Sequence, residues 1–586
     1  MRVVSARSLC VGFVVVVVAC ASPASSPKTP VAARAEGYGR VTEDTTDDPS
    51  IARAEQEYVD LLVSISPEHA TELGIHTHDT DLDDRTLAGF ERNLAREEAM
   101  LRDVTQRFAH PRASRAARTD LALLTHSLAV DIRKGRDERP LERQPDVYAS
   151  PMNALFLMMA RDYAPAKDRA QNALARLEKI PAMLSVAKSN LKRPPRIWTQ
   201  VGMERASAAK AFFDEQRAPL SDALPDQKAR IDDALRAATN AYVDYRAFLE
   251  RDVLPRSDGE FAAGRSLFAF LLEQGYFLKD DPDALYQMAE KVFATTTAQM
   301  TALAKKIDPA AKDWPEVTAR LKDAHPTAPG LLAGYRQEVL RARAFLVAHD
   351  VVPLPPDDVL EVIDTPVFQR TTIQAAYDEP PPFDKVTKGF FFVTPVDASL
   401  PPAQQTEMLR ESDWGDIVDT AVHETYPGHH LQLSFARMHP SIIRKATATA
   451  ILEEGWALYS EELMAELGYY TDRERMMQLE WTLVRAARVL LDIGLHTRGM
   501  KFDEAVAVLT DKVHLERELA VSEVKRYTLS PTQPMSYLIG REMLFRMRAR
   551  YQEREKDRFT LRRFHSEVLS RGSIPPSLME EEIFEP

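Results

Sequence analysis

Apolar residues recur at three- and four-residue spacing along most of the chain after Pro49. Two examples are the sets Leu285, Met288, Val292, Phe293 and Leu483, Ala486, Val489, Leu490, Ile493. This spacing places apolar side chains on one face of a helix with 3.6 residues per turn. Asp281-Pro282 precedes the first set as a helix cap and a first-turn proline. The pattern predicts a mainly α-helical protein.

Residues 357–398 are the exception to the helical pattern. Val359-Leu360-Glu361-Val362-Ile363 and Phe390-Phe391-Phe392-Val393 are rich in β-branched or aromatic residues and lie between prolines. Such segments favour strands, so we expect a small β element here. Proline-rich breaks also occur at 193–195, 352–356 and 380–382. We predict one large α-helical domain over residues 51–586, for which two lobes around a groove are one arrangement.

The first 19 residues have the pattern of a secretory signal peptide. Arg2 and Arg7 precede an apolar run from Val11 to Val18. This run is shorter than the roughly 20 residues that cross a membrane. We therefore expect residues 1–19 to be cleaved and the remaining chain to be exported.

Cys20 follows Val17-Val18-Ala19, which resembles the bacterial lipobox, in which the cysteine becomes the acylated N-terminus. An ordinary cleaved signal with a cysteine there by chance is the alternative. Ala21-Ser22 after the cysteine favours the outer membrane, facing the periplasm. Residues 20–50 are rich in Ala, Ser, Pro, Thr and Asp, which predicts a lipidated cysteine and a flexible tether.

Charge and cysteine content disfavour a nucleic-acid partner and an internal disulfide. The net charge is −13, from 75 basic and 88 acidic residues, which disfavours a nucleic-acid partner. Cys10 and Cys20 are the only cysteines, and cleavage would remove the first. The exported protein would therefore have no internal disulfide and would depend on its buried core for stability.

Residues 423–430 read His-Glu-Thr-Tyr-Pro-Gly-His-His, which departs from the zinc signature H-E-x-x-H at Pro427. On an unbroken helix His429 would lie about 240° round from His423, and His430 about 10 Å further along the axis. Neither could share a zinc ion whose ligands lie about 2 Å from it. The ring of Pro427 would clash with the His423 carbonyl, however, and Gly428 tolerates unusual backbone angles.

The proline and glycine therefore predict a widened turn that takes up two residues and brings His429 to the position of a second ligand. A solvated histidine-rich helix end is the alternative, because histidine near a helix C-terminus interacts favourably with the helix dipole.

Residues 451–463 form an apolar helical segment with embedded acids. Glu454 and Glu461 are seven residues apart and lie on one face. Carboxylates in an apolar setting are costly unless they are paired or bind a metal. We expect Glu454 to be a third metal ligand and Glu461 to accept a hydrogen bond from a histidine N–H. Glu453 could take the place of Glu454.

These motifs resemble the bacterial family catalogued as domain of unknown function 885, and the likeness covers most of the mature chain. The segments that carry it are 423–432 and 454–459, then Asp492-Ile493-Gly494-Leu495-His496, Arg526-Tyr527, Gln533, Tyr537, Gly540 and, upstream, Ile180-Pro181-Ala182. That family is distantly similar to the helical zinc peptidases, which include angiotensin-converting enzyme, oligopeptidases and the carboxypeptidase Taq group. Those enzymes have Gly-His-x-Leu where this chain has Gly428-His429-His430-Leu431, which favours His429 over His430 as the ligand.

The resemblance implies a zincin-like helical fold and zinc-dependent hydrolysis of peptide bonds in the cell envelope. His423, His429 and Glu454 would hold Zn²⁺ with the fourth position open to water. Glu424 would be the general base, and His430 would support the site or bind substrate. The strand around Phe391–Val393 could pair with an extended peptide.

An oxyanion donor is also needed, and Tyr527, Tyr537 and His496 are the candidates. Tyr527 ranks first because Arg526 beside it could hold a substrate carboxylate. Asp492, four residues before His496, could orient or charge the imidazole. For each of the three donors, a buried hydrogen-bonded core residue is the alternative.

A protein of another class would keep the fold without turnover, as a binding or scaffold lipoprotein of the envelope. A hydrolase without a metal is disfavoured, because the sequence has no G-x-S-x-G motif and lipid would occupy its one mature cysteine.

Overall fold

The computed structural model describes residues 48–356, 359–365, 370 and 374–585. The predicted signal peptide, the predicted lipidation site Cys20 and the predicted tether up to residue 47 lie outside the described residues. The tether was expected to reach residue 50, but the first helix already begins at Pro49, where the Asp48 side chain accepts a hydrogen bond from Ser50 N–H. Among the described helices, none combines the length and the apolar composition of a membrane span.

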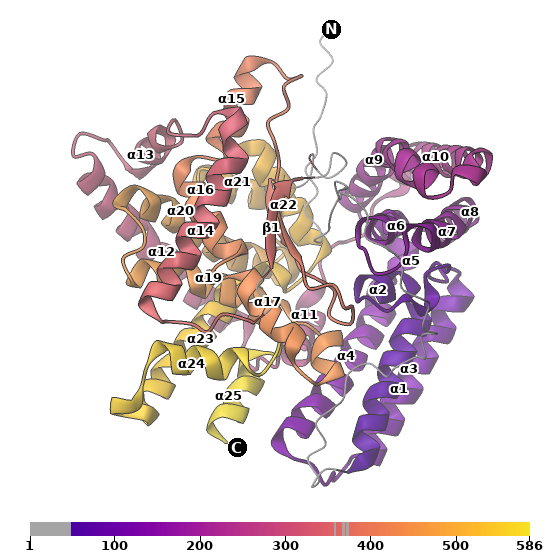
Figure 1. The fold of residues 1–586 in the computed structure, drawn as a ribbon, viewed down its shortest axis with the longest axis horizontal. Helices are drawn as coiled ribbons and strands as arrows, with labels where there is room; N and C mark the ends of the chain where they lie inside the picture. Colours follow the sequence, from indigo (N-terminus) through magenta and orange to yellow (C-terminus); the bar gives the residue numbers. More distant parts are fainter. Residues whose placement is uncertain (1–47, 357–358, 366–369, 371–373, 586) are drawn as a thin grey trace, which may run out of the picture.

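Helices fill the first part of the described chain, as the apolar periodicity predicts. Their bounds are α1 Pro49–Ile65, α2 Pro67–Glu72, α3 Leu87–Arg107, α4 Arg115–Glu138, α5 Pro140–Arg143, α6 Pro151–Ala160, α7 Ala166–Leu177, α8 Ile180–Asn190, α9 Arg196–Ala223, α10 Lys228–Phe248, α11 Gly264–Tyr276, α12 Pro282–Ile307, α13 Trp314–Leu321 and α14 Leu331–His349. Asp281 caps α12 through a hydrogen bond from Asp283 N–H, as its Asp-Pro start predicts. Figure 1 shows α1 to α10 gathered on one side of the molecule.

Three strands follow, β1 Leu360–Asp364, β2 Ala375–Asp378 and β3 Gly389–Val393. They form one sheet in the order β1-β3-β2, with β1 parallel and β2 antiparallel to β3. The two predicted strand segments became β1 and β3, whereas β2 was not predicted. Because β3 is central, both of its edges are occupied by other strands. The prediction that the strand around Phe391–Val393 pairs with a peptide is therefore wrong.

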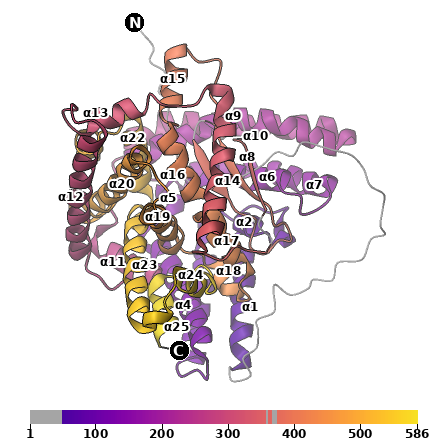
Figure 2. The same cartoon turned by 60° about the vertical axis from the view of Figure 1, so that its left-hand side comes forward.

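The rest of the described chain is helical and carries the histidine motif. The bounds are α15 Pro402–Arg410, α16 Trp414–Glu424, α17 His429–Met438, α18 Ile442–Ala446, α19 Ala450–Glu466, α20 Asp472–Thr497, α21 Phe502–Asp511, α22 Arg517–Leu529, α23 Gln533–Glu555, α24 Leu561–Leu569 and α25 Pro576–Phe584. In Figure 2 as in Figure 1, α16, α17 and α19 lie near the middle of the molecule, surrounded by other elements.

The hydrophobic core joins the two ends of the described chain. Its largest cluster combines side chains of α1 and α4 with those of α14, α16, α19 and α23, among them Tyr58, Leu124, Ile417 and Trp456. The N-terminal helices therefore help to fix the helices that carry the motif. The predicted fold class, mainly α with a small β element, is confirmed.

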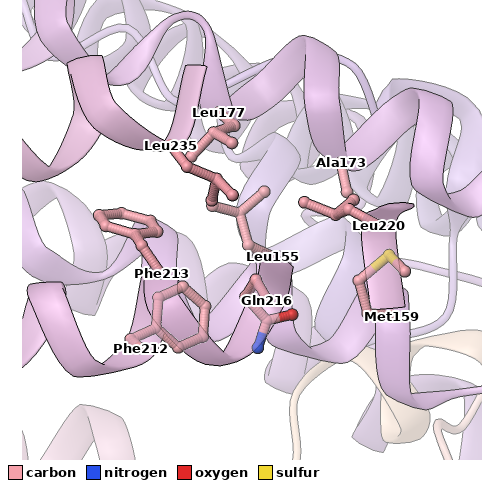
Figure 3. A pocket seen from close by; sticks show the side chains of 9 residues that line it. All are labelled: Leu155, Met159, Ala173, Leu177, Phe212, Phe213, Gln216, Leu220 and Leu235. Carbon is pink, nitrogen blue, oxygen red and sulfur yellow. The ribbon is translucent and has the colours of Figure 1, made fainter. Parts of the chain in front are cut away.

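A second cluster, built mainly from α6 to α10, contains an apolar pocket (Figure 3). Phe212 and Phe213 form part of its wall, and Gln216 is its one polar lining residue. The residues that line the pocket include neither a metal-binding set nor a titratable group.

Candidate metal centre

The break in the helical motif lies between α16, which ends at Glu424, and α17, which begins at His429. Gly428 N–H donates to the Val422 carbonyl at 3.1 Å, and Leu431 N–H donates to the Thr425 carbonyl at 3.3 Å. Each bond spans six residues instead of the four of an α-helix, so the backbone takes up the two extra residues here. The predicted detour is present, although it separates two helices and does not widen a single one.

A hydrogen bond from Trp456 in α19 holds this turn in place. Its indole N–H donates to the Pro427 carbonyl at 2.7 Å, and its side chain is fully buried. The turn is therefore fixed against the helix that carries the predicted third ligand.

Replacing Gly428 by alanine is expected to destabilise the protein by about 3 kcal/mol and to abolish metal binding. The added Cβ would lie 1.8 Å from the His423 carbonyl oxygen and 2.4 Å from that of Val422, so the turn must open. Denaturant unfolding and metal titration would measure both effects. Gly275→Ala in α11 is the control, because its new Cβ meets nothing closer than 3.9 Å. An unchanged metal affinity in the Gly428 variant would contradict the role of the turn.

His423, His429 and Glu454 converge from α16, α17 and α19. Glu454 Oε2 lies 3.6 Å from His423 Nε2 and 3.3 Å from His429 Nε2. Tetrahedral ligands that lie about 2 Å from a zinc ion stand about 3.3 Å from one another, so this separation fits a metal. Among the described residues, Glu454 Oε2 also has no hydrogen-bond partner, although it is buried. Two imidazoles and one carboxylate are a donor set of catalytic zinc sites.

The charges of this cluster are coupled. Burial lowers the pKa of His423, but the neighbouring carboxylates of Glu454 and Glu461 outweigh burial and raise it to about 10. Burial alone would raise the pKa of Glu454, whereas the two histidines hold it well below its usual range. The carboxylate is thus an anion beside a protonated imidazole, and a divalent cation would have to displace that proton.

Glu461 and Glu454 lie on one face of α19. Glu461 contacts the ring nitrogen of His423 that faces away from Glu454. Its Oε1 is 2.7 Å from His423 Nδ1, which fixes Nδ1 as the donor and turns Nε2 towards Glu454. Gln478 donates to the other oxygen of Glu461 at 3.4 Å. The predicted contact with a histidine N–H is present. Glu453 instead accepts a hydrogen bond from Ser573 at 2.8 Å, so Glu454 is the acid that faces both histidines.

His430 is buried on another side of α17. Its Nδ1 lies 3.1 Å from the Tyr377 hydroxyl, and its ring packs edge-on against Tyr377 and Tyr426. The structure therefore groups His429, and not His430, with His423 and Glu454.

Glu424, the predicted base, is partly exposed at the end of α16. One of its carboxylate oxygens, Oε2, accepts a hydrogen bond from Tyr377 N–H in β2 at 2.9 Å. Tyr377 therefore supports the motif twice, through its backbone at Glu424 and through its hydroxyl at His430. Sequence analysis missed it, because β2 gave no clear strand signal.

Tyr537 in α23 is the predicted oxyanion donor that lies beside the candidate metal ligands. Its ring centroid is 6.3 Å from that of His423, and burial together with the Glu454 carboxylate raises its pKa to about 12. The hydroxyl therefore keeps its proton at neutral pH. Helices α19 and α23 approach closely because Gly455 meets Gly540, where a Cβ on either residue would clash with backbone atoms.

Tyr527 is fully buried in α22, and its hydroxyl proton is engaged in a hydrogen bond within the protein. Its hydroxyl donates to Glu523 at 2.5 Å and accepts a hydrogen bond from Arg488 Nε at 3.2 Å. This geometry favours Tyr537 over Tyr527, which the sequence ranked first.

His496 has both ring nitrogens bound to backbone groups. Ala263 N–H donates to Nδ1 at 3.1 Å, and Nε2 donates to the Tyr527 carbonyl at 2.9 Å. Burial lowers the pKa of His496 to about 4, so the ring is neutral. Asp492 lies 3.8 Å away, beyond hydrogen-bond distance, and accepts from Thr532 N–H. Asp492 therefore does not charge His496 in this structure, and both ring nitrogens of His496 are held by backbone groups.

Arg526 is paired within the protein, with Glu523 at 3.1 Å and with the Gln533 side-chain oxygen at 2.8 Å. Sequence analysis missed its neighbours Arg485 and Arg488 in α20. Both are buried on a helix with an apolar face, and this unusual position of a charged residue was the available signal.

Fold and site together define a mainly helical protein in which two histidines and a glutamate, one of them buried and two partly exposed, meet at the junction of three helices. The chain belongs to the family described as bacterial protein of unknown function (DUF885), whose model matches residues 67–583. No curated protein matched this chain.

Two solved structures share the fold. A proposed lipoprotein of unknown function from Shewanella oneidensis is 24% identical, with a TM-score of 0.77 over 92% of this chain and 100% of the other. A proposed lipoprotein from Colwellia psychrerythraea is 17% identical, with a TM-score of 0.79 over 92% of this chain and 98% of the other. At these identities the likeness concerns the fold.

Proposed function

We propose that this protein is a zinc-dependent peptidase of the bacterial cell envelope. The observation that carries the proposal is the convergence of His423 Nε2, His429 Nε2 and Glu454 Oε2 at separations suited to one metal ion. The partial exposure of Glu424, His429, Glu454 and Tyr537 among buried neighbours gives solvent access to the same place. A zincin-like relationship through the H-E motif is part of this proposal.

Each residue has a role that follows from its chemistry. His423, His429 and Glu454 would hold the ion, and Glu461 fixes the orientation of His423. A bound zinc ion supplies Lewis-acid polarisation of the scissile carbonyl and acidifies water.

Glu424 takes the proton of the attacking water and returns it to the leaving amine. Its hydrogen bond from Tyr377 N–H holds one carboxylate oxygen in place, which leaves the other for proton transfer. The Tyr537 hydroxyl donates to the oxyanion that develops on the substrate carbonyl.

The N-terminal sequence supports a proposal for the cellular location of the protein. The relatives of known structure are described as proposed lipoproteins, and Cys20 follows a lipobox-like sequence in this chain. We propose anchoring by a lipid on Cys20, at the outer membrane and facing the periplasm.

The test uses the mature chain, purified without chelator. We expect about one zinc per chain by metal analysis. With a mixed peptide library, mass spectrometry should map cuts that disappear on chelation and return with added zinc. Cuts that persist in chelator, or a chain that takes up no zinc, would contradict the proposal. Zinc uptake without any cleavage would favour the binding or scaffold lipoprotein.

A further inference from the structure

A polar cavity lies where distant parts of the chain meet, and it shares no lining residue with the candidate metal ligands. Its wall combines the ends of α4 and α5 with Trp198 of α9, Phe261 before α11 and Pro531 between α22 and α23. Its volume is about 90 Å³. At about 10–15 Å³ for each water-sized group, it holds roughly six to nine such groups. That is the size of a small free amino acid.

Two opposite charges line this cavity without neutralising each other. Glu138 ends α4 and Arg143 ends α5, and both side chains are partly buried. Within the described residues, the Glu138 carboxylate makes no hydrogen bond and no ion pair. Arg143 donates through Nη2 to the Glu260 carbonyl, which carries no charge. The carboxylate and the guanidinium therefore both lack a charged partner, although they face one cavity.

The other charged groups nearby do not supply these partners. Asp137 also lines the cavity, but it accepts a hydrogen bond from Arg133 Nε at 2.5 Å. Burial raises the pKa of Glu138, and the attraction of Lys134 and Arg143 is too weak to offset the lost hydration. A cation in contact with this carboxylate would remove that cost, and an anion would do the same for Arg143.

The rest of the wall is apolar and fixed in place. The indole N–H of Trp198 donates to the Thr528 carbonyl at 3.1 Å, and the Arg143 guanidinium carbon lies 5.7 Å from the centroid of its ring. Phe261 adds a second aromatic ring to the wall. Ala262 in the wall is exposed, so a ligand can enter from solvent. The cavity thus offers one anionic, one cationic and one apolar contact.

We propose that this cavity binds a free α-amino acid, with its ammonium on Glu138, its carboxylate on Arg143 and an apolar side chain against Trp198 and Phe261. A zwitterion completes both charged groups at once, whereas a simple anion or cation completes only one. The site is separate from the candidate metal ligands, so this proposal does not depend on the peptidase function.

The test is calorimetry on the mature chain with L-valine, and with L-alanine and L-leucine as smaller and larger ligands. Two analogues of valine each lack one charge, because isovalerate has no ammonium and isobutylamine has no carboxylate. We expect a single saturable site for the amino acids. Each analogue should bind at least about 10-fold more weakly than valine, because it loses one charge-assisted contact.

Variants of the two charged residues assign each end of the ligand. Glu138→Gln should weaken valine binding by about 10- to 100-fold and leave isovalerate unchanged. Arg143→Gln should weaken valine by a similar factor and leave isobutylamine unchanged, and Arg143→Lys should retain part of the affinity. Asp214→Asn on α9 and Arg236→Gln on α10 are matched controls at exposed positions, and both should bind valine as the wild type does.

Two further measurements make the result decisive. Thermal unfolding of each variant without ligand shows whether it is folded. Because a zinc ion can also bind amino acids, the titration is repeated on chelator-treated protein, where the affinity for valine should be the same. The proposal would be overturned by the absence of saturable binding for all three amino acids, or by binding that needs the metal. Equal affinities for valine and its analogues, or an affinity that both charge variants leave unchanged, would overturn it as well.

Discussion

Glutamine at position 424 is expected to lower kcat/KM for peptide hydrolysis by about 10²- to 10⁴-fold, while the protein keeps its zinc and its fold. The side chain keeps its size, and its amide oxygen still accepts the hydrogen bond that Tyr377 N–H donates to Glu424. What it loses is the ability to take a proton from water. Steady-state kinetics on a peptide from the library, with zinc content measured on the same sample, would give the effect.

Glu466→Gln is a matched control for this variant, because Glu466 lies on α19 and pairs with Arg548 at the surface. We expect it to retain wild-type activity and zinc. Undiminished hydrolysis by the Glu424 variant would remove Glu424 as the general base, whereas loss of zinc would show that the residue supports the ligands instead.

The helical fold could be predicted because its signals are local. The spacing of Leu285, Met288 and Val292 and the Asp281-Pro282 cap define α12 without reference to any other element. The sheet was predicted only in part. Ala375-Ala376-Tyr377-Asp378 has one strong β-former. It becomes β2 because it pairs with the edge of β3 opposite β1. The central position of β3 depends on that pairing and was therefore missed.

The convergence of the candidate metal-binding residues was predictable for the same reason. Pro427 and Gly428 predict the turn that links His423 and His429. Glu454 and Glu461 are two turns apart on one helix. The roles of more distant residues depend on tertiary partners that no spacing reveals. From the sequence Tyr527 looked available, but in the fold its hydroxyl donates a hydrogen bond to Glu523. Arg485 and Arg488 on α20 lie over the ring of Tyr537 because α20 and α23 pack together.

His429→Ala is expected to weaken zinc binding by more than about 100-fold and to abolish hydrolysis. Changes to residues that merely support metal ligands cost about 10- to 100-fold in affinity, and removal of a ligand should cost more. The variant leaves Glu454 facing one imidazole, so two of the three donors remain. Competition with a chromophoric chelator would measure the affinity.

The neighbouring histidine makes this experiment discriminating. His430→Ala removes a contact with Tyr377 and not a donor of the cluster, so it should cost about 1–3 kcal/mol of stability but retain zinc. His349→Ala, at an exposed position at the end of α14, should change neither. The reverse result, with zinc lost from the His430 variant and kept in the His429 variant, would show that the ion is not held where α16, α17 and α19 converge. The turn at Pro427 and Gly428 would then have no part in metal binding.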